Sequence, residues 1–151
     1  MERIEVSRVF PVSPAEAFVY VTDMRKWPSF LPGFVRIEDA ARARWGKVGD
    51  RAEVVVRLFG RKGTLDMELE EFQEGERVKF VIRQAGLPTA HHERHFLANP
   101  GGCECRFVAL FEPRPGITAL YDRLLVKWGI TTVLRRALDA LDSAFRRASP
   151  V

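Results

Sequence analysis

The sequence predicts an α+β protein with one seven-stranded antiparallel sheet and one long C-terminal helix. Between residues 51 and 112, apolar and polar residues alternate over five segments, and short turns rich in glycine, asparagine or proline separate these segments. Such alternation is typical of strands, and connections this short favour antiparallel neighbours. From residue 117 to about 147, apolar residues instead recur at steps of three and four, which is the period of a helix.

The length and composition are those of a single soluble domain. The chain has 151 residues, of which 46% are hydrophobic and 29% are charged, and this balance excludes a largely disordered chain. No repeat or linker is visible, so we expect residues 1–151 to form one domain. No apolar run approaches the ~18 residues of a membrane span, and no secretory leader is visible. We therefore expect a cytoplasmic protein.

The first 38 residues predict a strand, two short helices and a second strand. The first strand is expected at residues 4–10. Ser13, Pro14 and Glu16 form a capping box with proline at the first helical position, which predicts a helix over 14–22. Asp23 is expected to cap a second short helix, and a strand is expected around Val35 and Ile37. Five further strands are expected at 51–59, 64–72, 77–84, 90–98 and 103–112.

The positions of the turns predict which strand residues lie side by side. With turns at Arg61-Lys62 and Glu74-Gly75 and loops near Leu87 and at 99–102, the expected neighbours are Leu58 with Leu65, Val56 with Met67, Met67 with Ile82, Leu69 with Phe80, Ile82 with His92, Phe80 with Arg94, Arg94 with Phe107, and His92 with Ala109. These pairs agree on one inner sheet face: Val54, Val56, Leu58, Leu65, Met67, Leu69, Val78, Phe80, Ile82, Phe96, Cys105, Phe107, Ala109 and Phe111. A slip of one residue would turn a strand inside out, so this agreement is informative.

Two polar residues, His92 and Arg94, also fall on the inner face. A buried arginine without a partner is very costly, so Arg94 needs an ion pair, water or a polar ligand. Glu71 at the end of the same face is a candidate partner. Arg8 is a third inward candidate, because it shares a strand face with apolar residues. Two interpretations remain open: a satisfied polar pair in a plain core, and a cavity over the sheet that holds water or a ligand.

The outer face carries the one pattern that resembles a metal site. His91, Glu93 and His95 lie on one side of their strand, and two histidines with a carboxylate can bind a catalytic metal. The register places them on the exposed outer face, where nothing encloses a metal. We therefore expect no metal and no cofactor. Cys103 and Cys105 lie too far apart along one strand for an unstrained disulfide, so we expect two buried, reduced thiols.

A basic loop is the main feature of the charge pattern. The net charge is +4 and the isoelectric point is about 9.4, without the dense basic stripe of a nucleic-acid-binding protein. Arg42, Arg44 and Lys47 cluster around Trp45. This loop is either a solvated surface or an edge that makes transient contact with an anionic membrane.

Two segments give the chain a resemblance to a known family. They are FPVSPAEAF at residues 10–18 and TDMRKWPSFLPG at residues 22–33. Together with the order of elements, they resemble the START-like superfamily of polyketide cyclase/dehydrase and lipid-transport domains, also called SRPBCC. The resemblance implies the helix-grip fold, in which the curved sheet wraps around the C-terminal helix. It also implies a cavity for a hydrophobic ligand between them, and it carries over no catalytic residue.

Three functions are compatible with these observations. The first is binding or carrying an apolar small molecule, such as a lipid, an isoprenoid quinone or a polyketide-like compound. The second is an aromatase/cyclase-type enzyme, with His92 as general acid/base and Arg94 stabilising an enolate oxygen. The third is an interaction module. We expect Leu124, Trp128 and Leu138 to pack against the inner face. The expected ligand contacts are Val56, Met67, Phe80, His92, Arg94, Phe107, Leu124 and Trp128.

Overall fold

The computed structural model describes residues 1–148 and contains a seven-stranded antiparallel sheet. The strands are β1 (Glu2–Phe10), β2 (Phe34–Glu38), β3 (Arg51–Leu58), β4 (Arg61–Gln73), β5 (Arg77–Arg83), β6 (Ala90–Asn99) and β7 (Gly102–Phe111). Their order in the sheet is β1-β7-β6-β5-β4-β3-β2. The helices are α1 (Pro14–Thr22), η1 (Met24–Lys26), α2 (Trp27–Phe30), α3 (Thr118–Tyr121), the π-helical turn η2 (Asp122–Val126) and α4 (Lys127–Ala148). The expected fold class is confirmed.

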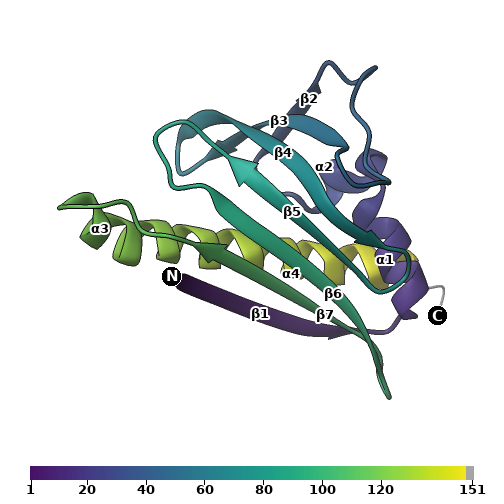
Figure 1. Ribbon diagram of the computed structural model, residues 1–151. Coiled ribbons are helices and arrows are strands. Elements are labelled where there is room, and N and C mark those ends of the chain that lie inside the picture. Colours follow the sequence, from purple (N-terminus) through teal and green to yellow (C-terminus); the bar gives the residue numbers. More distant parts are fainter. Residues whose placement is uncertain (149–151) are drawn as a thin grey trace.

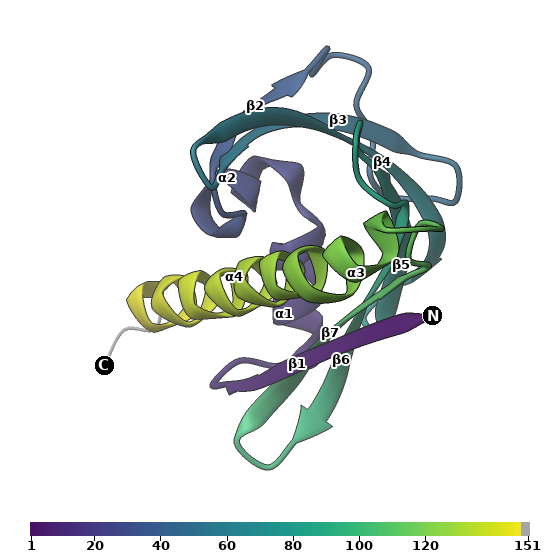
Figure 2. The ribbon, with the colours of Figure 1, turned by 90° about the vertical axis from the view of Figure 1, so that its left-hand side faces the viewer.

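The sheet curves around the C-terminal helix. Figure 2 shows the strands as an arc with α4 running through its concave side. The helices α1 and α2 lie toward the C-terminal end of α4, whereas α3 projects past the other end of the sheet (Figure 1). At the end near α1, Phe145 of α4 meets the rings of Phe10 and Tyr20, each with 5.1 Å between ring centres. The concave side is therefore closed by aromatic packing at one end.

The connection between β1 and β2 forms for the local reasons that the sequence predicted. The Ser13 hydroxyl accepts a hydrogen bond from the backbone N–H of Glu16 at 3.1 Å, and Pro14 occupies the first turn of α1. The carboxylate of Asp23 accepts from the backbone N–H of Arg25 and caps η1. Gly33 then turns the chain at φ 69°, where a side chain would collide with the carbonyl oxygen of Arg57.

The second half of α4 is held against the sheet by apolar packing and by one set of ion pairs. Leu134, Leu138 and Leu141 are buried, which confirms the expected position of Leu138. Arg8 of β1 forms ion pairs with Asp139 and Asp142 of α4, the latter at 3.1 Å. The charge of Arg8 is therefore directed toward the helix and compensated there.

The inner face of the sheet matches the predicted one. Eleven of its fourteen predicted apolar members are buried, and the other three, Leu58, Leu65 and Ile82, are partly buried against the same core. The pairing of β6 with β7 also has the predicted register, with Arg94 opposite Phe107. The β4–β5 pairs of Met67 with Ile82 and Leu69 with Phe80 are confirmed as well.

Two predicted registers are wrong by an even number of residues. The turn between β3 and β4 is formed by Phe59 and Gly60, so Leu58 lies opposite Arg61 and not Leu65. Between β5 and β6, Phe80 lies opposite His92, two residues from its predicted neighbour. Side chains alternate with a period of two, so even shifts leave every residue on its predicted face.

The first turns of the C-terminal helix do not pack as predicted. Leu124 and Trp128 are 60% and 58% exposed, so the expectation that they face the sheet is wrong. The physical reason is that Asp122 and Val126 take the inward positions of this stretch and are buried, which leaves Leu124 and Trp128 on the side that the sheet does not cover. A π-helical turn over Asp122–Val126 interrupts the regular helix near its start. Within residues 1–148, no helix is long and apolar enough to cross a membrane.

Candidate functional site

Arg94 lies at the centre of the concave sheet face, enclosed by aromatic rings. Only 7% of the residue is exposed. Its guanidinium carbon lies 4.6 Å from the centre of the Phe107 ring and 5.1 Å from that of Phe80, which come from β7 and β5. A third ring, Phe30 of α2, lies 5.8 Å away. The sheet and α2 together build this enclosure, and we call Arg94, His92, Phe30, Phe80 and Phe107 the Arg94 site.

Arg94 has no anionic partner among residues 1–148. Its Nε has no hydrogen-bond partner, and the ion pairs in this part of the chain include none made by Arg94. The predicted partner, Glu71, is turned away by a bulge between Leu69 and Glu71. Its carboxylate instead accepts a hydrogen bond from Arg77 at 3.2 Å, which lowers its pKa, and pairs with Lys79 at 3.5 Å. The interpretation of Arg94 and Glu71 as a satisfied pair is therefore wrong.

The guanidinium of Arg94 remains a charged donor. Burial lowers the pKa of Arg94 to about 10, so the group still carries its proton at neutral pH. The ring faces attract the cation by roughly 0.5–2 kcal/mol, but they do not replace the oxygen acceptors that guanidinium N–H groups normally bind. The arrangement can therefore hold a carboxylate, phosphate, carbonyl or hydroxyl oxygen between apolar walls.

His92 lies next to Arg94 as a neutral imidazole. Its ring stacks on Phe80 with 5.3 Å between centres and 9° between planes, and the residue is 8% exposed. Burial, assisted by the nearby charge of Arg94, lowers the pKa of His92 to about 3. At neutral pH this ring therefore donates or accepts one hydrogen bond per nitrogen but holds no extra proton to transfer.

The structure brings six of the eight predicted ligand contacts together on the inner sheet face. Val56 of β3 and Met67 of β4 are buried on this face and belong to the same apolar core as Phe80 and Phe107. The remaining two, Leu124 and Trp128, lie on the exposed start of the helix. Prediction missed Phe30, because it belongs to a short helix whose sequence has no period that orients its side chains.

In the basic loop at residues 40–49, Trp45 is less exposed than the basic residues around it. Trp45 meets Trp27 and Phe80 edge to face, with 5.3 and 5.4 Å between ring centres, so its ring packs on the core beside the Arg94 site. Arg42 pairs with Asp39 at 3.5 Å, and Arg44 donates to backbone carbonyls of the same loop. Only the basic groups of this loop remain for contact with an anionic surface.

The histidines of the outer face and the two cysteines lie where the sequence predicted them. His91 and His95 lie outward as predicted, and each forms a 2.9 Å contact with a carboxylate, Glu70 and Glu93 respectively. Residues 1–148 contain no group of three potential metal ligands close enough to share an ion. Cys103 and Cys105 are free, buried thiols with their sulfur atoms 3.8 Å apart.

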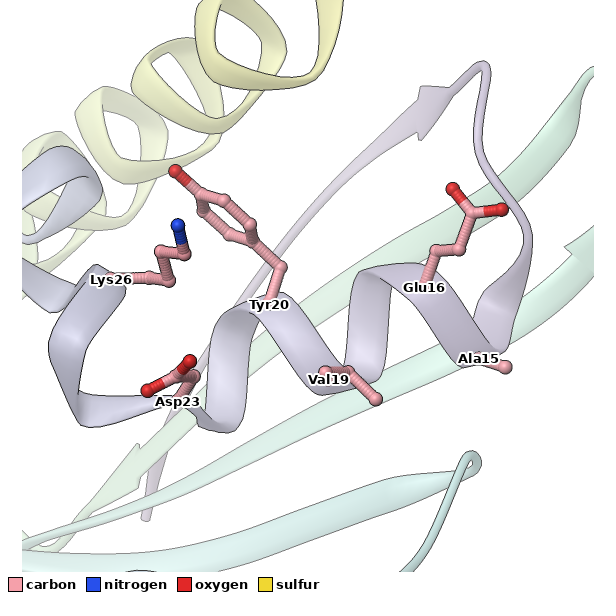
Figure 3. A pocket seen from close by; sticks show the side chains of 6 residues that line it. All are labelled: Ala15, Glu16, Val19, Tyr20, Asp23 and Lys26. Carbon is pink, nitrogen blue, oxygen red and sulfur yellow. The ribbon is translucent and has the colours of Figure 1, made fainter. Parts of the chain in front are cut away.

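A surface hollow of about 380 Å³ opens beside α1. Figure 3 shows its lining, which comes from α1 and the segment that follows: Ala15, Glu16, Val19, Tyr20, Asp23 and Lys26. Two of its polar groups are already engaged, since the Tyr20 hydroxyl lies 2.6 Å from that of Ser29 and Asp23 binds Arg25. The Arg94 site, with its unpartnered cation, is the stronger candidate for ligand binding.

Comparison with known proteins identifies the family. Residues 1–146 match the family described as polyketide cyclase/dehydrase and lipid transport, and the chain belongs to this family. No curated protein sequence matches the chain.

Solved structures share the fold at low sequence identity. The protein TTHA0849 from Thermus thermophilus superposes with a TM-score of 0.80 at 19% identity, covering 99% of this chain and 100% of that one. A START superfamily protein from Mycobacterium smegmatis gives 0.76 at 14% identity, covering 97% and 99%. A third match is the protein MLL2253 from Mesorhizobium loti, with 0.78 at 14% identity and coverage of 99% and 100%. The chain therefore has the START-like, helix-grip fold.

Proposed function

We propose that this protein binds or carries an apolar small molecule on the concave sheet face, with an oxygen of the ligand held by Arg94. The observation that carries this proposal is the buried, charged Arg94 with no anionic partner among residues 1–148. An apolar wall with a few polar groups is the usual composition of a small-molecule site. The family and its fold support a hydrophobic ligand.

The ligand class follows from the two parts of the site. Val56, Met67 and Phe80 offer apolar contact to a hydrocarbon chain or a ring system. Arg94 offers charge-assisted hydrogen bonds to a carboxylate, phosphate or carbonyl oxygen, and His92 offers one more hydrogen bond. Fatty acids, isoprenoid quinones and polyketide-like compounds combine these two parts. A role as cyclase/aromatase has less support, because an imidazole whose pKa is about 3 is a weak base at neutral pH.

A matched pair of probes tests the proposal. We would titrate the protein with a pyrene-labelled fatty acid and with the pyrene-labelled alcohol of the same length. We expect the wild type to prefer the acid. Arg94→Met should weaken binding of the acid by roughly 10- to 150-fold, because a charge-assisted hydrogen bond contributes ~1.5–3 kcal/mol. The alcohol should be affected less.

A control variant separates this effect from a general loss of positive charge. Arg106→Met removes an arginine from the outer face of the same sheet and should leave both affinities unchanged. Native mass spectrometry of protein purified from its own host gives a second measurement, because a retained apolar molecule would show directly as added mass. Equal binding of the acid by wild type and Arg94→Met would contradict the role of Arg94. Failure of both probes, with no retained molecule, would contradict the proposed function.

A further inference from the structure

The exposed start of the C-terminal helix carries an apolar stripe that the sheet does not cover. Ile117, Leu120, Leu124, Leu125 and Trp128 recur at helical spacing, and their exposed fractions range from 55% to 91%. Such a stripe normally faces a protein core. Here it lies along the first turns of the helix, on the side opposite the buried Asp122 and Val126, and these turns begin at α3, which projects past the sheet (Figure 1). Contiguous exposed apolar surface of this kind marks an interaction site.

The turn between β3 and β4 adds a sixth apolar residue to this surface. Phe59 is 53% exposed, and its ring lies 5.4 Å from that of Trp128. It occupies a tight turn at φ 51°, a conformation that costs a bulky residue free energy and that asparagine or glycine would adopt more easily. We call Phe59 and the five residues of the stripe the apolar tip.

The exposed charges on the two segments that carry the apolar tip are positive, and the nearby Glu2 of β1 is paired with Lys127 at 3.5 Å. Arg61 and Lys62 follow Phe59 at the same turn and are exposed, and residues 54–65 contain no acidic residue. On the helix side, Arg123 is exposed, and Asp122 is the only acid in residues 113–129. Asp122 is fully buried and engaged by Arg114. No acidic side chain from either segment therefore offsets the exposed cations.

We propose that the apolar tip is a docking surface for an anionic lipid membrane. An apolar helix face with tryptophan and neighbouring basic residues is the pattern of a segment that lies in a membrane interface. Trp128 and the half-exposed Tyr121 are of the residue types that favour the headgroup region. A second copy of the chain fits less well, because face-to-face contact would bring Arg61, Lys62 and Arg123 of two copies together.

Vesicle binding tests this inference. We would measure co-sedimentation of the full chain with vesicles of phosphatidylcholine alone and of phosphatidylcholine with 25% phosphatidylglycerol. We expect binding to the anionic vesicles, weakened by high salt, and little binding to the neutral ones. Arg61→Glu/Lys62→Glu should weaken binding by at least about 25-fold, since each basic residue near an anionic surface contributes about 5-fold. Leu124→Ser/Trp128→Ser should reduce it by at least tenfold.

The matched control is the other basic surface. The Arg42→Glu/Lys47→Glu variant changes the net charge by the same amount as Arg61→Glu/Lys62→Glu, but in the loop that the sequence alone suggested for membrane contact. This variant should bind the vesicles nearly as well as the wild type. In the wild-type chain, lipids brominated on acyl-chain carbons close to the headgroup should quench tryptophan fluorescence. The quenched signal is assigned to Trp128, because Trp27 is buried and Trp45 packs on the core.

Three outcomes would overturn the inference. They are absence of wild-type binding to the anionic vesicles, loss of binding only in the Arg42→Glu/Lys47→Glu variant, and a dimer in sedimentation velocity that Leu124→Ser/Trp128→Ser dissociates. The inference is separable from the ligand at Arg94. Arg94→Met should still bind the vesicles, so a failed ligand titration and a failed vesicle assay point to different errors.

Discussion

The guanidinium of Arg94 lies 4.6 Å from the centre of the Phe107 ring, its direct neighbour across the β6–β7 ladder. No acidic side chain of residues 1–148 pairs with this cation. A ring face offers the guanidinium attraction but no strong acceptor. The pair therefore holds a charge in the core at a cost in stability, and this cost is what a bound oxygen would reduce.

Replacing Arg94 should stabilise the ligand-free fold or leave it unchanged. Arg94→Met keeps much of the side-chain volume and removes a desolvated charge. Buried charges are often replaced by apolar groups with no loss, or with a gain of ~1–4 kcal/mol. We expect a higher midpoint in urea denaturation of the ligand-free protein, with an unchanged slope. A large loss of stability would show that Arg94 is a structural tie.

Acid should destabilise the protein through His92. The unfolded chain binds a proton at this residue below about pH 6.5, whereas the folded protein binds it only near pH 3. The contribution of neutral His92 is fully present above pH 6.5. Below that, the free energy of unfolding should fall with pH by up to ~1.4 kcal/mol per pH unit from this residue.

Urea denaturation at pH 7, 5 and 4 measures this slope. His92→Leu should show a shallower fall in stability between pH 6.5 and 4 than the wild type. The carboxylates with lowered pKa values, such as Glu71 and Asp122, titrate in both proteins and form a common background. Parallel pH profiles of wild type and variant would mean that His92 is hydrated in solution.

The faces of the strands could be predicted from the sequence, but several of their neighbours could not. Side chains along a strand alternate with a period of two. Arg94 and His92 are therefore predicted to face inward even if the predicted register is wrong, as long as the error is an even number of residues. Phe59-Gly60 forms the β3–β4 turn, where Arg61-Lys62 was predicted, because glycine at the second position favours a turn with two positive φ angles. The bulge between Leu69 and Glu71 has no comparable signal in the sequence. The pairing of Glu71 with Arg94 was therefore wrongly predicted.

The helix shows a second limit of prediction. A stripe such as Leu120, Leu124 and Trp128 indicates that one face of a helix is apolar, but not what covers that face. The tertiary contacts decide this, because Asp122 and Val126 are the residues buried in this stretch and the stripe is left on the other side of the helix. In the same way, Phe30 and Trp45 reach the neighbourhood of Arg94 from a short helix and a loop, where no period orients a side chain.

Zinc should not bind specifically at the outer histidines. His91 and His95 each contact a different carboxylate on an open surface, and no third ligand lies with them among residues 1–148. We expect one equivalent of Zn²⁺ to leave the thermal midpoint unchanged. A rise that disappears in His91→Ala/His95→Ala would show that the two histidines converge on a metal in solution.

Removing the charge of Asp122 should loosen the start of the helix before the rest of the fold. Asp122 is fully buried in the π-helical turn and accepts from the backbone N–H of Arg114 at 2.7 Å and from its guanidinium at 2.7 and 3.0 Å. The Arg114 hydrogen bonds lower the pKa of Asp122, so its contribution is present above pH 4 and is lost in stronger acid. Asp122→Asn should lower the thermal midpoint at pH 7 by roughly 4–8 °C, which corresponds to a loss of ~2 kcal/mol at about 2–4 °C per kcal/mol for a chain of this size.

Hydrogen exchange locates the effect along the chain. Amides of residues 118–126 should exchange much faster in Asp122→Asn, whereas those of residues 134–145, which pack on the sheet, should change little. Asp139→Asn is the matched control, because Asp139 also pairs with an arginine but is mostly exposed on α4. That variant should leave exchange at residues 118–126 unchanged. A uniform rise across both segments in Asp122→Asn would show that the exposed start of the helix and the gripped part of α4 unfold as one unit.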